Sequence, residues 1–139
     1  MKVRFTQADR LIAMYKHRLN YVKVMVPARI MQAQQRPRGA GGRMPVVTGE
    51  LQDSLVVDAG GTLLIGRDAY RQLINLPAFE GGIMWGWTAP YADRINYGFT
   101  GIDSMGRYYD QKGVHFIEYG ESLAKRIGRD EVKRASNMK

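Results

Sequence analysis

The residues of this chain that could perform catalysis are few and lie far apart. The two histidines, His17 and His115, belong to opposite halves of the sequence. Neither has a second histidine four residues away, the spacing that holds zinc on a helix. Glu50 and Asp53 form a close pair of carboxylates, but acids are favoured in the first turn of any helix. The chain has no cysteine, which excludes thiolate metal sites and disulfides. We therefore expect no enzyme, no metal and no cofactor.

Three arginines, Arg36, Arg38 and Arg43, lie in the segment QRPRGAGGRMP at residues 35–45. This segment has little to bury, and glycine is entropically expensive to fix, so we predict a flexible basic loop. It lacks the Gly-Lys-Ser/Thr ending of a phosphate-binding P-loop. Its arginines could contact DNA phosphates without sequence preference. A solvated linker is the alternative interpretation for each of them.

The whole chain has a net charge of +8, and its positive charge is concentrated in the first third. Residues 1–45 carry 10 lysines and arginines and one acid, a net +9, whereas residues 46–139 carry 11 and 12, a net −1. This asymmetry indicates contact with a polyanion, and the alternative is a solvated basic helix face.

Length and composition are typical of a single globular domain, with 139 residues of which 45% are hydrophobic. No apolar run approaches the ~18 residues that a membrane span needs. The first ten residues, MKVRFTQADR, lack the apolar segment of a secretory signal. We expect a protein without membrane contact, from a reducing compartment or from a particle assembled there.

A long helix is predicted over residues 6–34. Pro27 should kink or break it near Met25 or Val26. Apolar residues at steps of three and four form a stripe on one face, which is either part of the core or a packing surface for a neighbouring subunit. The stripe consists of Leu11, Tyr15, Leu19, Val22, Val26 and Ile30.

Residues 46–98 are predicted to form a strand-rich core. Aliphatic runs at 56–57 and 62–65 flank the turn sequence DAGG at 58–61, which is the pattern of a β-hairpin. A short helix is expected over residues 67–75, where apolar residues recur at helical spacing.

Four aromatic residues are candidate contacts between subunits. Trp85 and Trp87 alternate with other residues and should share one face of a strand. They either fill the core or anchor a neighbouring subunit. Tyr108 and Tyr109 lie in residues 99–113, which we predict to be a long loop that reaches a neighbour.

The last element is predicted to be a helix over residues 114–136, broken near Arg129 by Gly128. The chain as a whole, residues 1–139, is expected to form one α+β domain. We expect a long N-terminal helix, a small and mainly antiparallel β-sheet, and a C-terminal helix packed on the sheet.

Three short motifs follow one another along the chain. The first is Pro45-Val46-x-Thr48-Gly49-x-Leu51-x-x-Ser54-Leu55, and the second is Ala89-Pro90-Tyr91-Ala92 with Asn96-Tyr97-Gly98 after it. The third, His115-Phe116-Ile117, opens the last predicted helix. Together they resemble the signature of tail-completion proteins of long-tailed bacteriophages, which are head–tail joining, or neck, components related to tail terminators. That family often has an acid at the position of Asn96.

The resemblance implies a structural virion protein. Its copies would form a homohexameric ring in the phage neck that joins portal or head-completion proteins to the tail tube around the DNA channel. Its partners would be copies of itself and the neighbouring neck and tail-tube proteins, and it would assemble in the host cytoplasm. The residues that match the motifs are given structural roles by the resemblance: Pro45, Thr48, Gly49, Leu51, Ser54, Pro90, Tyr91 and Gly98.

A nonspecific nucleic-acid-binding protein is the alternative function. It would bind through the basic N-terminal segment, in which Tyr15 and Tyr21 are the only tyrosines. No known binding module is apparent in the sequence.

Overall fold

The computed structural model describes residues 6–46 and 48–138. They form helices and two small antiparallel sheets, which confirms the predicted α+β class. No helix within these ranges is long and apolar enough to cross a membrane. The elements, in chain order, are α1 (Thr6–Gln35), η1 (Arg38–Ala40), α2 (Glu50–Asp53), β1 (Leu55–Ala59), β2 (Thr62–Ile65), α3 (Ala69–Ile74), β3 (Ile83–Trp87), α4 (Ala92–Tyr97), β4 (Gly98–Ile102), β5 (Tyr108–Lys112), α5 (Phe116–Ser122) and α6 (Ala124–Ser136).

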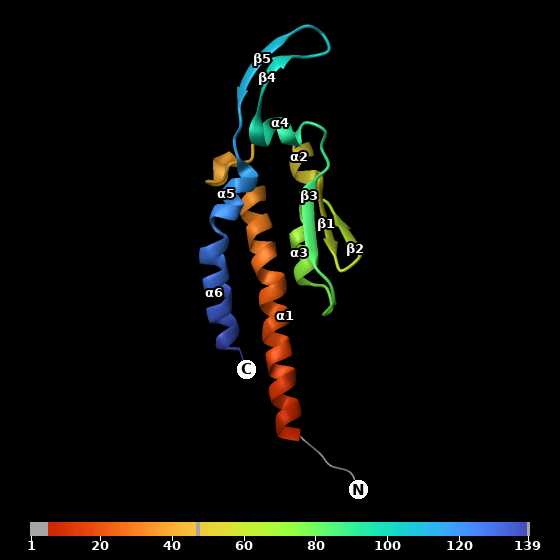
Figure 1. The fold of residues 1–139 in the computed structure, drawn as a ribbon, viewed down its shortest axis with the longest axis vertical. Coiled ribbons are helices and arrows are strands. Elements are labelled where there is room, and N and C mark those ends of the chain that lie inside the picture. Colours follow the sequence, from red (N-terminus) through yellow and green to blue (C-terminus); the bar gives the residue numbers. More distant parts are fainter. Residues whose placement is uncertain (1–5, 47, 139) are drawn as a thin grey trace.

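Helix α1 runs through the centre of the molecule (Figure 1). Helices α5 and α6 pack along one side of it, and α3 with the sheet β2-β1-β3 lies on the other side. The last helix, which we expected on the sheet, therefore packs on α1 instead. Gly120 of α5 makes this packing close, because a Cβ at this position would collide with the side chain of Gln34.

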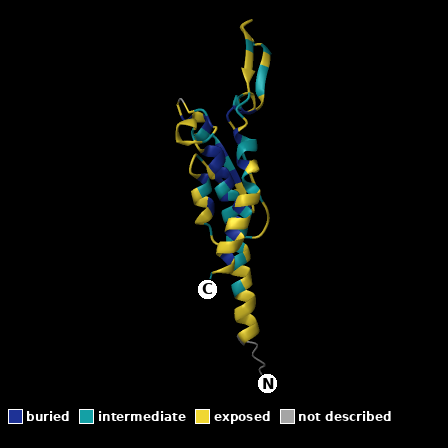
Figure 2. Cartoon of the chain, turned by 90° about the vertical axis from the view of Figure 1, so that its left-hand side faces the viewer, coloured by how far each residue is buried: buried dark blue, intermediate teal, exposed yellow. Residues whose placement is uncertain are grey.

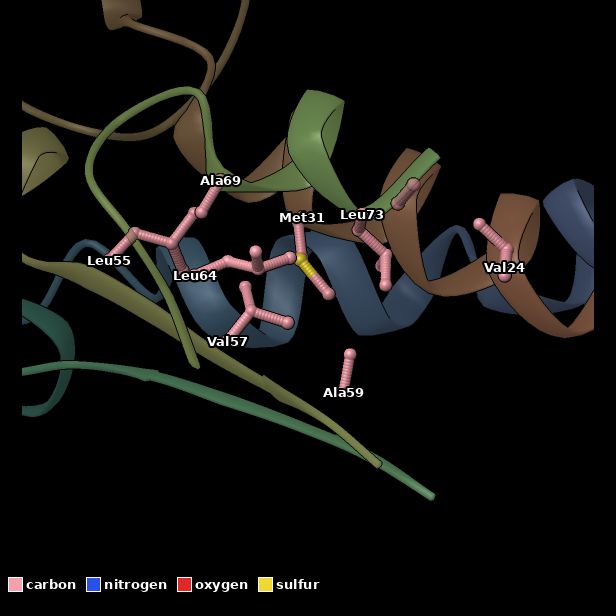
Figure 3. Packing of buried hydrophobic residues seen from close by; sticks show 9 residues of the cluster. Val24, Met31, Leu55, Val57, Ala59, Leu64, Ala69 and Leu73 are labelled. Carbon is pink, nitrogen blue, oxygen red and sulfur yellow. The ribbon is translucent and has the colours of Figure 1, made fainter. Parts of the chain in front are cut away.

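The predicted hairpin at the centre of the chain is confirmed. Strand β1 pairs antiparallel with β2 through the turn at Gly60-Gly61, and with β3 along its other edge. The buried core beneath this sheet is shared by α1, the sheet and α3 (Figure 3). Each large aliphatic side chain buried there contributes about 1.5–3 kcal/mol. Its members are Val24, Ala28, Met31, Leu55, Val57, Ala59, Leu64, Ala69 and Leu73.

Two adjacent glutamines join α1 to the sheet. Gln34 and Gln35, named here the glutamine pair, are 1% and 5% exposed. Their Oε1 atoms accept hydrogen bonds from the indole Nε1 of Trp85 and of Trp87, each at 2.8 Å. The Nε2 of Gln34 also donates to the carbonyl of Ile117 in α5, at 2.9 Å. One helical turn thus binds elements on both of its sides.

Gln35 also fixes the segments beside the sheet. Its Nε2 donates to the carbonyls of Gln52, at 3.0 Å, and of Arg67, at 3.1 Å. The Nε2 of Gln52 donates back to the carbonyl of Gln35 at 2.9 Å. Both ends of the Gln35 amide are therefore satisfied, as burial of a polar group requires.

A buried carboxylate fixes α6 against α1. Glu131 is 0% exposed and accepts hydrogen bonds from the hydroxyl of Tyr21, at 2.7 Å, and from Nη1 of Arg29, at 3.0 Å. Nη1 of Arg134 donates to the same carboxylate at 2.6 Å. The hydrogen bond to Glu131, with burial, raises the pKa of Tyr21. Two guanidinium groups thus balance the charge of this carboxylate.

Helices α1 and α6 are not broken where breaks were predicted, and a kink at Pro27 stays a prediction. Helix α1 continues through Pro27, although a proline inside a helix costs about 3 kcal/mol. Packing of α3, α5 and α6 around α1 outweighs this cost. Helix α6 likewise continues through Gly128, and the interruption between α5 and α6 falls at Leu123.

The N-terminal part of α1 extends beyond the rest of the molecule (Figures 1 and 2). Leu11, Tyr15 and Leu19 of the predicted apolar stripe are exposed there, whereas Ile30 is buried. The stripe therefore enters the core only in its second half, where α3, α5 and α6 cover the helix.

The predicted loop at residues 99–113 is instead the hairpin β4–β5. The carboxylate of Asp103 closes its turn by accepting from the backbone N–H groups of Met105 and Arg107, both at 2.9 Å. The backbone hydrogen bond that Arg107 donates, reinforced by its guanidinium group, lowers the pKa of Asp103. The polar residues of segment 99–113 indicate a loop by composition, but in the structure Asp103 stabilises the turn between two strands.

Removing the amide of Gln35 should destabilise the fold. Gln35→Leu leaves the indole N–H of Trp87 and the partners of the Gln35 Nε2 without bonds, which should cost about 2–4 kcal/mol. Gln32→Leu, at an exposed position one turn earlier, is the matched control and should change stability by less than about 0.5 kcal/mol. Urea unfolding measures both, and equal losses in the two variants would contradict the role of the glutamine pair.

Neutralising Glu131 should lower the free energy of unfolding more than neutralising Asp130 does. Glu131→Gln keeps the side-chain size but removes the charge that binds Arg29 and Arg134, with an expected loss of about 2 kcal/mol. Asp130→Asn removes an exposed carboxylate 3.7 Å from Arg29 and should cost less than about 0.5 kcal/mol. Thermal unfolding of both variants tests the difference, and a similar loss would show that Glu131 does not fix α6.

Candidate interaction surfaces

The candidate catalytic residues do not come together. His17 is exposed on the projecting part of α1, and the Nδ1 of His115 lies 3.7 Å from Oε2 of Glu118. Asp53 pairs with Arg67 at 2.5 Å, and this hydrogen-bonded guanidinium lowers the pKa of Asp53. Among the residues that the structure describes, no three histidines or acids are grouped to hold a metal.

The three sequence motifs converge on one buried cluster. Leu51 comes from the first motif, Ala89 and Ala92 from the second, and Phe116 from the third. The fifth buried member, Met44, lies directly before the first motif. Burial, with the nearby carboxylate of Glu50, raises the pKa of Tyr91, so the first two motifs also meet at the edge of the cluster. The motif residues thus form a structural junction.

The first motif forms a tight turn that leads into α2. The hydroxyl of Thr48 accepts from the backbone N–H of Glu50 at 3.3 Å, and Gly49 has a left-handed φ of 82°. The hydroxyl of Ser54 donates to the carbonyl of Leu51 at 2.7 Å, which ends the helix. Pro45 is half-buried before this turn.

The second motif connects the sheet to the hairpin. Pro90 is exposed and Tyr91 half-buried just before α4. Gly98 has a φ of 87°, and a Cβ there would lie 2.6 Å from the carbonyl oxygen of Gln111 on the neighbouring strand. Only glycine fits where the chain passes from α4 into β4.

Asn96 links the second motif to the third. It is 0% exposed; its Oδ1 accepts from the N–H of Ile117 at 3.0 Å, and its Nδ2 donates to Oε1 of Glu118 at 3.0 Å. An aspartate could accept the first bond but could not donate the second. An asparagine at position 96 therefore suits the glutamate that it faces in this chain.

Trp85 and Trp87 lie on the inner side of the sheet. Their indoles bind the glutamine pair, and Trp87 packs edge-on against Phe116 with ring centroids 4.9 Å apart. They share one face, as predicted, and they fill the core, the first of the two interpretations above.

The hairpin β4–β5 projects away from the core (Figures 1 and 2), and it carries exposed apolar side chains. Ile102 and Tyr108 face each other across the strands, each 68% exposed, and Met105 at the turn is 75% exposed. On the other face, Tyr109 packs on Phe99 with ring centroids 6.4 Å apart. We call Ile102, Met105 and Tyr108 the hairpin surface.

The outer face of the three-stranded sheet is also apolar except for Asp58, which is exposed between Leu63 and Met84. Leu63 and Ile65 of β2, Val56 of β1 and Met84 of β3 lie on it. Leu63, Ile65 and Met84 are 63–75% exposed, because the described helices cover only the opposite face. We call these four residues the sheet surface. Sequence reasoning missed this surface, because the aliphatic run of β2 does not show which face of the sheet the helices cover.

The arginine loop forms a hydrogen-bonded turn, and its flexibility stays a prediction. The backbone of Arg38 donates to the carbonyl of Met44 at 3.1 Å, and Met44 donates to Arg36 at 3.2 Å. Met44 is 0% exposed and anchors the turn. Arg38 and Arg43 line one pocket, whereas Arg36 lines another beside Arg67. Lys2 and Arg4 of the basic segment lie outside the described residues.

Replacing Asn96 by aspartate should destabilise the junction of α4 and α5. Asn96→Asp places a second carboxylate against Glu118 in a fully buried position, with an expected loss of about 2–3 kcal/mol. Asp93→Asn, an isosteric change at an exposed position of α4, should alter stability by less than about 0.5 kcal/mol. Chemical unfolding compares them, and a neutral Asn96→Asp would contradict the assigned hydrogen bonds.

Comparisons of the chain with protein-family models, with curated proteins and with solved structures gave no match.

Proposed function

We propose that this chain is a structural subunit of the neck of a long-tailed bacteriophage. Its copies form a homohexameric ring around the DNA channel, between the portal or head-completion proteins and the tail tube. The proposal combines the resemblance of the three motifs with the distribution of exposed apolar side chains. In this role the chain works by forming interfaces in the virion, without chemical turnover.

The observation that carries this proposal is the hairpin surface on a projecting β4–β5 hairpin. A two-stranded hairpin is marginally stable in water by itself. This one packs on the body through α4, while Ile102, Met105 and Tyr108 face outward. Exposed apolar patches of this kind mark contacts with other proteins. A neighbouring subunit that covers the hairpin surface would supply the missing packing.

The sheet surface is the second surface of the proposed contact between subunits. It lies on β1, β2 and β3, in a different part of the molecule from the hairpin (Figure 1). A hairpin surface that meets the sheet surface of the next copy makes a head-to-tail contact, and such contacts close into a ring when the rotation allows it. Six copies follow from the family resemblance.

A nonspecific nucleic-acid-binding protein is the second candidate. The net charge of +9 in residues 1–45 favours it. Such a protein would be a monomer or dimer with steeply salt-dependent DNA affinity. The ring subunit would instead be an oligomer whose DNA affinity is negligible at physiological salt.

A charge on the hairpin surface should disrupt the ring. Ile102→Asp places a carboxylate where a neighbouring subunit would bury an apolar side chain, so the oligomer should dissociate to monomers. Light scattering after size-exclusion chromatography measures the mass, and circular dichroism checks the fold. Val132→Asp, at a 52% exposed position of α6, is the control and should keep the oligomer.

Two results would contradict the proposal. One is a wild-type chain that stays monomeric or dimeric and binds DNA with a steep salt dependence. The other is an Ile102→Asp variant that forms the same oligomer as the wild type.

A further inference from the structure

We infer that a basic pocket at the base of the hairpin binds backbone phosphates of DNA. The pocket has a volume of about 520 Å³ and brings together the arginine turn, the end of β5 and the start of α5. Its cationic residues are Arg38, Arg43 and Lys112, which we call the basic pocket residues. Lys112 is not identified by sequence reasoning, because the strand that positions it, β5, is predicted to be part of a loop.

The arginine side of the pocket is fixed by the backbone. Pro37 and Met44 pair through a β-bridge, and the N–H of Gly42 donates to the carbonyl of Pro37 at 2.9 Å. This closes the turn between Arg38 and Arg43. The guanidinium of Arg43 lies over the ring of Tyr119, 5.5 Å from its centroid. Such stacking holds the planar cation while its N–H edges stay free to bind an anion.

The opposite side is fixed by the return of the hairpin to the body. The N–H of Val114 donates to Ile95 at 2.9 Å, and that of His115 to Asn96 at 3.0 Å. A Cβ on Gly113 would collide with the backbone of Asn96, so only glycine permits this approach. Lys112, directly before Gly113, is therefore anchored at the pocket rim.

The pocket carries an excess of positive charge. Three permanent cations, Arg38, Arg43 and Lys112, line it with one carboxylate, Glu118. Glu118 already accepts from Asn96 at 3.0 Å. Within the described ranges, no salt bridge includes any of the three cations. A site with a net charge of about +2 suits two neighbouring phosphodiesters, which arginine and lysine bind without reading sequence.

DNA fits this pocket better than an acidic protein segment does. Protein interfaces need apolar anchors at their centre. The apolar side chains of this lining are Val114 and Tyr119, and the guanidinium of Arg43 already lies over the second. Phosphates need only the cations. The inference deepens the proposed function, because a DNA channel through the ring would bring phosphates to the pocket.

The test compares two variants of equal charge. Arg38→Gln with Arg43→Gln removes two pocket cations. Arg126→Gln with Arg129→Gln removes two exposed cations of α6 that lie outside the pocket. Binding of a labelled duplex of about 20 base pairs is followed by fluorescence anisotropy between about 50 and 200 mM salt. Poly-glutamate serves as the competing probe, and light scattering gives the oligomeric state.

We expect the pocket variant to lose affinity and its salt slope to fall by about 2, since each phosphate contact contributes about 0.9. The control variant should keep the wild-type slope. Equal losses in both variants, no wild-type binding at about 50 mM salt, or stronger binding to poly-glutamate would each overturn the inference. A monomer whose binding depends on the pocket would refute the ring alone, and a ring with equal losses would refute the pocket alone.

Discussion

The glutamine pair is the contact on which the arrangement of this molecule depends. Helix α1 separates the sheet from α5 and α6, and the two sides touch the same helical turn. Gln34 reaches from Trp85 on one side to Ile117 on the other. Gln35 binds Trp87 and both segments beside the sheet. Because these amides are buried, each lost bond leaves an unsatisfied polar group, and the position of the helix between its two neighbours is sharply defined.

The hydrogen bonds of the glutamine pair determine which side chains face inward and which surfaces stay exposed. The indole N–H groups of the two tryptophans are bound by the glutamine pair, so these side chains face inward and pack on the core. Most of the large apolar side chains left outside lie on the hairpin surface, the sheet surface and the projecting turns of α1. Asn96, Gly98 and Gly113 join the hairpin to the body near the cluster where the motifs converge. The motifs therefore build the base from which the hairpin surface and the basic pocket extend.

Much of the fold could be predicted from local patterns, and the long-range contacts could not. Aliphatic runs on both sides of a glycine turn predict β1 and β2, and helical spacing predicts α1 and α3. Pro27 predicted a kink or break in α1, because the sequence shows the local cost of a proline in a helix but not the packing that outweighs this cost. Polar side chains misled in residues 99–113, where Asp103 stabilises a turn between strands. No sequence pattern indicates the buried roles of Glu131 and the glutamine pair. Most of their hydrogen-bond partners lie at least 51 residues away in the sequence. The nearer partners are Gln52, Arg67 and Arg134.

The same limit applies to the candidate sites. The three arginines of residues 35–45 were identified by composition, but composition could not show that Arg36 faces a different pocket from Arg38 and Arg43. Lys112 joins the last two only through the hairpin. Exposure of the sheet surface depends on which face the helices cover, which is a property of the whole fold.

Hydrogen exchange of the backbone amides in β4 and β5 tests the central claim most directly. If a neighbouring subunit covers the hairpin surface, these amides should exchange fast in dilute protein and slow down markedly at concentrations where the chain oligomerises. Equally fast exchange of the hairpin in the dilute and the assembled protein would contradict the account.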